Sequence, residues 1–128
     1  MQDILSYEQV RDGIRDVINR HPEGVDHTYS RPEGAGVCLY VHNDGPSCIV
    51  GHYLINVLGV AKCAIEEREG IGVSSLAKIL RAEGAMPGLD FQASVFLNVV
   101  QAEQDSGAPW GEAYETALSY IKDRQEEE

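Results

Sequence analysis

The sequence has few cysteines, no excess of basic residues and no long hydrophobic run. Its three cysteines, Cys38, Cys48 and Cys63, are an odd number, which is typical of reduced thiols rather than of a disulfide framework. No apolar run approaches the roughly 18 residues of a membrane-spanning helix. Residues 1–6 lack the basic and apolar regions of a signal peptide. We therefore expect a cytoplasmic protein with no membrane partner.

Basic residues are also scarce. Ten lysines and arginines oppose 21 acidic residues, so the formal net charge is −11. This charge disfavours nucleic acid and anionic membranes, which both require a basic surface. The acidity is concentrated in residues 84–128, where nine acidic residues face only Lys122 and Arg124. Such a surface either keeps the protein soluble or docks on a basic partner.

The length and composition predict one folded domain over residues 1–128. A chain of 128 residues with 43% hydrophobic residues can bury a usable core without disulfides or metals. Apolar residues recur at helical spacing in six segments. Ser6 and Gln9 form a capping-box pattern before the first segment, Ser74 or Ser75 is the expected cap of the fourth, and Asp90 is the expected cap of the fifth. The predicted helices cover about 7–20, 48–58, 60–69, 74–83, 90–104 and 110 to the acidic tail at 125–128, which we expect to fray.

The remaining segments predict loops and one small β element. Residues 22–36 are rich in proline and glycine and predict a loop. Residues 37–42 favour a strand, and the Asn-Asp-Gly sequence at 43–45 indicates a tight turn. Residues 47–50 fit either a returning strand or the start of a helix. The expected fold class is therefore mainly α, α+β at most, a compact bundle of about six helices with one small β-hairpin or strand near residues 37–50.

Two sequence blocks carry a resemblance. The first is C-x-Y…G-P-S-C-I-V-G-H-x-L, within residues 38–54, and the second is Q-x-x-Q-D-x-G-x-x-W-x-x-A, over residues 101–113. Together they resemble small uncharacterised proteins encoded by actinobacteria and, especially, by their phages. The resemblance implies no activity. It implies a phage-encoded viral protein that works in the cytosol of a bacterial host.

Cys48 and His52 form the sharpest local pattern. If a helix begins at Ser47, Cys48 lies in its first turn, where the helix dipole lowers the pKa of a thiol. His52 lies one turn later on the same face and could pair with the thiolate. Cys38 could then act as a resolving thiol. The simpler interpretation is that Cys48 is a small core residue, because its neighbours are apolar.

The same residues could bind a metal. Cys38, Cys48 and His52 are residue types that zinc prefers, and His42 extends the pattern to C-x3-H-x5-C-x3-H. Residues four apart on a strand are separated by about 13 Å, so Cys38 and His42 could not share one ion there. The chain has no C-x2-C pair. We therefore expect no cofactor, with zinc as the alternative.

Residues 61–81 suggest a third interpretation. Two short predicted helices flank Gly-Ile-Gly-Val at 70–73, as in a helix-turn-helix DNA-binding regulator. The same pattern describes any two packed helices with a turn. The segment carries balanced charges in an acidic protein, which disfavours DNA binding.

The sequence contains no complete set of catalytic residues, so the leading hypothesis is a non-enzymatic protein that binds a host protein. The composition is also compatible with a homo-oligomer. We expect the acidic surface of the last two helices to make the contact. Its candidate residues are Glu103, Asp105, Glu112 and Glu115.

Overall fold

The first helix begins where its sequence predicts. Helix α1 spans Tyr7–Arg20, and the Ser6 hydroxyl accepts a hydrogen bond from the backbone N–H of Gln9 at 3.2 Å. The Gln9 side chain in turn accepts from the Ser6 N–H at 2.9 Å, which completes the predicted capping box. The computed structural model describes residues 4–29, 40–42, 45–68 and 71–126.

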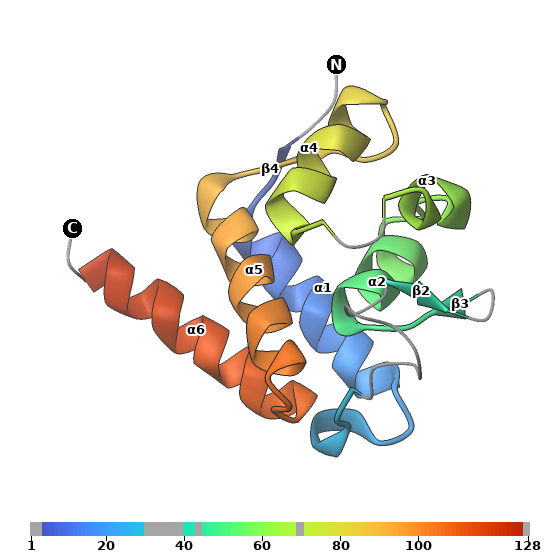
Figure 1. Cartoon of the computed structure of the whole chain (residues 1–128). Helices are drawn as coiled ribbons and strands as arrows, with labels where there is room; N and C mark the ends of the chain where they lie inside the picture. Colours follow the sequence, from blue (N-terminus) through green and yellow to red (C-terminus); the bar gives the residue numbers. More distant parts are fainter. Residues whose placement is uncertain (1–3, 30–39, 43–44, 69–70, 127–128) are drawn as a thin grey trace.

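The last two helices form an antiparallel hairpin. Helix α5 spans Phe91–Asp105, and its predicted cap, Asp90, accepts a hydrogen bond from the Ala93 N–H at 2.7 Å. Gly107, with a φ of 101°, turns the chain into helix α6, Trp110–Glu126. These two helices make the most extensive contact between elements (Figure 1). Helix α6 reaches Glu126, so it continues into the tail that was expected to fray.

A short 3-10 helix, η1 (Gly24–Asp26), packs against the start of α6. The Trp110 N–H donates to the His27 carbonyl at 2.8 Å. A Cβ at Gly111 would lie 2.6 Å from Cβ of Val25, so only glycine allows this contact. Part of the predicted loop at 22–36 is therefore an ordered turn on α6, and residues 30–36 lie outside the described residues.

The apolar segment after the turn is helical and central. It forms α2 (Ile49–His52), which continues directly into the π-helical turn η2 (Tyr53–Val57). This resolves residues 47–50 in favour of a helix. The cap is not Ser47, because Cys48 has the extended backbone of a cap and its thiol accepts from the Gly51 N–H at 3.4 Å.

Two glycines allow other parts of the chain to approach this segment. A Cβ at Gly13 on α1 would lie 2.3 Å from the Tyr53 ring, and one at Gly51 would lie 2.0 Å from the Tyr40 carbonyl oxygen. The close helix crossing explains why α1 carries a glycine, which costs about 1 kcal/mol relative to alanine in a helix. Gly59, with a φ of 74°, then ends the helical segment.

The described residues contain two small sheets. Strand β2 (Val41–His42) pairs antiparallel with β3 (Gly45–Pro46), in the predicted place. Tyr40, also predicted to lie in the strand, is a bend before β2. The other predicted strand residues, 37–39, and the turn residues 43–44 lie outside the described residues. A second pair was not expected: β1 (Ile4–Leu5) runs parallel to β4 (Gly88–Leu89). The fold class is nonetheless mainly α, as predicted.

Two shorter helices lie between the central segment and α5. Helix α3 spans Lys62–Glu66, and helix α4 spans Val73–Ala82. The cap of α4 is Gly72, not Ser74 or Ser75, and no side chain caps it. Helix α3 packs against β2, whereas α4 packs against α5 and β4. Each helix of the predicted helix-turn-helix pattern therefore has its own packing partner.

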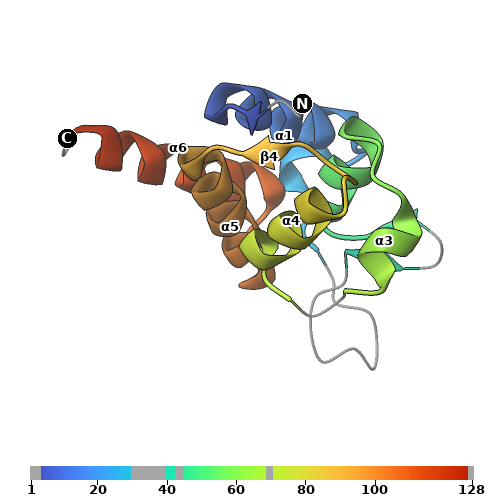
Figure 2. The same cartoon turned by 90° about the horizontal axis from the view of Figure 1, so that it is seen from above.

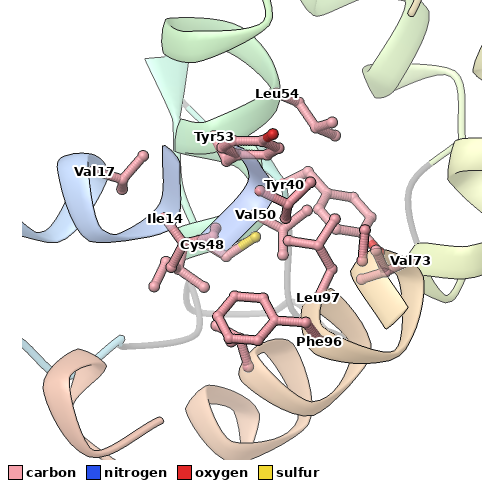
Figure 3. Packing of buried hydrophobic residues seen from close by; sticks show 14 of the residues in the cluster. Ile14, Val17, Tyr40, Cys48, Val50, Tyr53, Leu54, Val73, Phe96 and Leu97 are labelled. Atoms are coloured by element: carbon pink, nitrogen blue, oxygen red, sulfur yellow. The ribbon is translucent and has the colours of Figure 1, made fainter. Parts of the chain in front are cut away.

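One hydrophobic core joins these elements. It takes its largest fully buried side chains from α6, η2, α5, α1, α2, α3 and α4 (Figure 3). Figures 1 and 2 both show the C-terminal part of α6 reaching beyond this body. In the described part of the chain, every helix is too short or too polar to cross a membrane. The largest buried residues are Trp110, Tyr53, Phe96, Ile14, Ile49, Ile65, Leu76, Leu80 and Leu97.

Trp110→Ala should lower the free energy of unfolding by about 3–5 kcal/mol, because the side chain is fully buried. Chemical denaturation followed by circular dichroism measures the change. Phe91→Ala is the matched control, since Phe91 is 72% exposed and its loss should cost about 0.5 kcal/mol or less. Equal effects of the two substitutions would contradict the assignment of Trp110 to the core.

Candidate functional site

The Cys48 thiol lies in the hydrophobic core. Its side chain is fully buried and lies among Ile14, Val50 and Tyr53 (Figure 3). Burial raises the pKa of this thiol to about 12, and the hydrogen bond from the Gly51 N–H opposes that rise only in part. The thiol is therefore protonated at neutral pH, which favours the core interpretation over a reactive nucleophile.

His52 faces a different group of residues. Its ring lies 6.1 Å from the ring of His21 and 5.5 Å from that of Trp110, both edge-to-face. His21 and His27 stack at 3.9 Å, and each also meets Trp110 edge-on, at 4.9 Å and 4.6 Å. Three imidazoles thus surround one buried indole. We call these four residues the histidine–tryptophan cluster.

Local contacts orient the three rings. The Glu23 N–H donates to Nδ1 of His21 at 3.1 Å, which makes that nitrogen an acceptor and places the proton of the neutral ring on Nε2. Nδ1 of His52 lies 3.4 Å from the Asn56 amide nitrogen. Nδ1 of His27 lies 3.4 Å from a Glu23 carboxylate oxygen. In the neutral His21 ring, Nε2 can therefore donate a hydrogen bond but cannot bind a metal.

The cluster favours neutral imidazoles. Burial lowers the pKa of His21 and of His52 below the usual 6.5. Repulsion from the neighbouring histidines lowers each pKa further, and Glu23 opposes the change at His21. At neutral pH these two rings are therefore uncharged, and each accepts a proton only as the pH falls below 6.5.

The geometry does not assemble the predicted metal ligands. Cys38 lies outside the described residues, and the Cys48 thiol points into the core while His52 contacts the cluster. Among residues 4–29, 40–42, 45–68 and 71–126, no three His, Cys, Asp or Glu side chains are placed to hold a metal ion. For His21 to bind a metal through Nε2, it would have to give up the hydrogen bond from Glu23.

Two depressions lie beside the cluster and share His21 and His52. One has a volume of about 210 Å³ and is also lined by Arg20 and Asn56. The other has a volume of about 350 Å³ and includes His27. Among the described residues that line these depressions, Arg20 is the only permanent cation. Its guanidinium pairs with the Asp16 carboxylate at 3.0 Å, which partly neutralises its charge.

The four predicted partner-binding acids differ in their surroundings. Glu112 and Glu115 are exposed on the first turns of α6. Glu103 is half-buried. Asp105 is exposed but accepts hydrogen bonds from the side chains of Gln104 at 2.8 Å and Gln101 at 3.3 Å. Asp105 therefore has a structural role that its sequence position did not indicate.

The sequence indicates no role for His21 or His27, and Trp110, which begins a regular apolar stripe, is predicted to be a core residue. The two histidines lie beside prolines and glycines, where loop residues are common. Their convergence depends on η1 folding back onto α6, which brings residues 27 and 110 together through the hydrogen bond between their backbones. No local spacing in the sequence could indicate this.

Acidification should destabilise the protein through this cluster. Because the folded pKa values of His21 and His52 lie below 6.5, the unfolded chain binds protons first as the pH falls. The stabilisation is therefore complete above pH 6.5 and is lost as the pH falls from 6.5 towards the folded pKa values. Urea unfolding at several pH values measures the loss. His21→Gln with His52→Gln should flatten the dependence, and parallel curves for the two proteins would contradict the prediction.

Cys48 should resist a thiol reagent while the protein is folded. A chain with Cys38→Ser and Cys63→Ser leaves Cys48 as the one thiol. At pH 7.5 it should react at least about 100-fold more slowly than free cysteine, because burial suppresses the thiolate. Unfolding in urea should restore the ordinary rate. Faster labelling of the folded chain than of free cysteine would revive the thiol hypothesis.

The chain was compared with known protein families, curated proteins and solved structures. No family model, curated protein or solved structure matches the chain.

Proposed function

We propose that this protein acts by binding another protein, and not by catalysis, through an acidic surface where η1 packs on the start of α6. Glu112 and Glu115 carry the proposal. Both are exposed, and neither has a cationic partner among the described residues, whereas each arginine of α1 pairs with an aspartate. They are three residues apart and so lie on the same face of the helix.

An exposed apolar residue lies beside these acids. Val25 of η1 is 56% exposed and rests against Gly111, directly before Glu112. Asp26, next to Val25, is exposed as well. An apolar contact bordered by carboxylates suits a partner that presents lysines or arginines around a hydrophobic residue. Glu103 is a secondary contributor, because it is half-buried.

The resemblance to phage proteins suggests the setting. A phage-encoded protein in a bacterial cytoplasm meets host proteins, so we propose a host protein with a basic surface as the partner. Neither the thiol nor the metal alternative at Cys48 and His52 gains a supporting contact from the described residues. The helix-turn-helix alternative gains none either, because α3 and α4 pack on different elements.

Charge reversal tests this surface. Glu112→Lys with Glu115→Lys should weaken capture of the host partner at least about tenfold, since two rim contacts become repulsive. Glu8→Lys with Glu66→Lys is the control, because both residues are exposed on other helices and the charge change is the same. Asp105 stays unchanged, since it holds Gln104. Capture from a host lysate is quantified by mass spectrometry at low and high salt.

The result expected is salt-sensitive capture that the first pair of substitutions abolishes and the control pair leaves in place. Capture that is equal for all three proteins would place the contact elsewhere. A lysate from which the unaltered chain captures nothing would contradict the proposal itself.

A further inference from the structure

A separate hollow lies at the opposite end of α5, where α4 packs beside its first turns. Figures 1 and 2 show α4 and the start of α5 next to each other, with β4 leading into α5. The hollow has a volume of about 420 Å³. That size is within the usual range for small-molecule sites. The side chains that matter here are those of Ser74, Lys78, Arg81, Asp90, Phe91 and Ser94, and we call the site the Arg81 hollow.

Two cations line this hollow, and neither has a carboxylate partner among the described residues. Lys78 and Arg81 are three residues apart on α4, so they share a face, and both are exposed. Among the described arginines, those of α1 and Arg68 each pair with a carboxylate, and Arg81 does not. In a protein of net charge −11, two neighbouring cations without a carboxylate partner among the described residues form an unusual basic site.

The guanidinium of Arg81 lies against the backbone of β4. A Cβ at Gly88 would lie 2.8 Å from the guanidinium carbon and 2.9 Å from Nε, so the guanidinium lies against the glycine. The contact places the guanidinium at the edge of the hollow, where its N–H groups can meet an anion.

One carboxylate also lines the hollow, but its oxygens are occupied. Asp90 accepts from the Ala93 N–H through one oxygen at 2.7 Å and from the Tyr7 N–H through the other at 3.0 Å. Its charge therefore stabilises the start of α5 and joins it to α1. With Lys78 and Arg81, the charged groups of the hollow carry a net positive charge.

Two hydroxyl groups face each other at the same place. Oγ of Ser74 lies 2.9 Å from Oγ of Ser94, and the Asn98 amide donates to Oγ of Ser74 at 2.5 Å. A consistent order of donors runs from Asn98 to Ser74 and then to Ser94. In that order the Ser94 O–H can donate to an oxygen of a bound anion.

An aromatic ring completes the lining. Phe91 is 72% exposed, more than any other large hydrophobic residue in the described part of the chain. An exposed phenyl ring gives a flat apolar surface beside the two cations. Aromatic side chains in such positions stack on nucleobases, at about 1–3 kcal/mol per base.

We propose that the Arg81 hollow binds a nucleoside phosphate. Lys78, Arg81 and the Ser94 hydroxyl bind the phosphate, and the base stacks on Phe91. The same chemistry occurs in a free nucleotide and at the end of a single strand. The net charge of −11 repels a long polyanion, so the free nucleotide is the ligand that the electrostatics favour.

Calorimetric titration of the full chain with AMP, adenosine, inorganic phosphate and an eight-residue oligothymidylate tests the proposal. AMP should bind saturably with a Kd on the order of 0.1 mM. Phosphate and adenosine should each bind at least about tenfold more weakly, since each makes only part of the contacts. If the oligonucleotide binds more tightly than AMP, the ligand of the hollow is the end of a single strand and not a free nucleotide.

Three substitutions assign the contacts. Arg81→Gln should weaken AMP binding at least about tenfold, and Phe91→Ala should remove the advantage of AMP over phosphate. Gly88→Ala should weaken binding while keeping every charge, because it displaces the guanidinium. Lys122→Gln, an exposed cation on α6, is the matched control and should bind as the unaltered chain does. Circular dichroism checks that each variant is folded.

Two results would overturn the proposal. The first is the absence of saturable AMP binding up to about 10 mM, which is weaker than any specific site of this kind. The second is binding that Arg81→Gln leaves unchanged, which would place the site elsewhere, or that Lys122→Gln weakens equally, which would show only general attraction to cations.

Discussion

The buried start of α2 is the constraint on which the rest of the fold depends. The first N–H groups of a helix have no partner within the helix, and here they lie in the core. The Cys48 thiol accepts from Gly51 at 3.4 Å, and Oε1 of Gln104, on α5, accepts from the Ile49 N–H at 2.8 Å. An unpaired buried N–H would cost about 1–3 kcal/mol. A side chain near the end of α5 thus fixes where the central helix begins.

Asp105 completes this arrangement. A carboxylate at the C-terminus of a helix is unfavourable, because the helix dipole is negative there. The Asp105 carboxylate accepts from the Gln104 amide nitrogen at 2.8 Å, which directs the amide oxygen towards Ile49. Asp105 is therefore tolerated at the end of α5 because it orients the Gln104 side chain for the hydrogen bond with Ile49. The acidic residues near α6 therefore differ in role: Asp105 orients a core hydrogen bond, whereas Glu112 and Glu115 have no cationic partner among the described residues.

Capping residues in the sequence correctly predicted where two helices begin. The capping box at Ser6 and the cap at Asp90 indicated where α1 and α5 begin, because each cap acts within three residues. The start of α4 was mispredicted, since the chain enters that helix at Gly72 without a side-chain cap. The β1–β4 pair, the histidine–tryptophan cluster and the Arg81 hollow join residues distant in sequence. Their residues carry no shared pattern. Packing of α5 against α1 and α4 forms the β1–β4 pair and the Arg81 hollow, whereas packing of η1 on α6 forms the cluster.

Helix α5 also separates the two proposed surfaces. Its 15 residues span about 20 Å, so a protein held at the start of α6 would leave the Arg81 hollow open. The two ends differ in sign: free carboxylates lie beyond the last turn of α5, and free cations lie beside its first turn. A basic partner would be repelled by Lys78 and Arg81, and a nucleotide phosphate would be repelled by Glu112 and Glu115. Each proposed surface would therefore exclude the ligand of the other, so a strongly acidic chain could combine the proposed nucleotide site with the proposed contact for a basic protein.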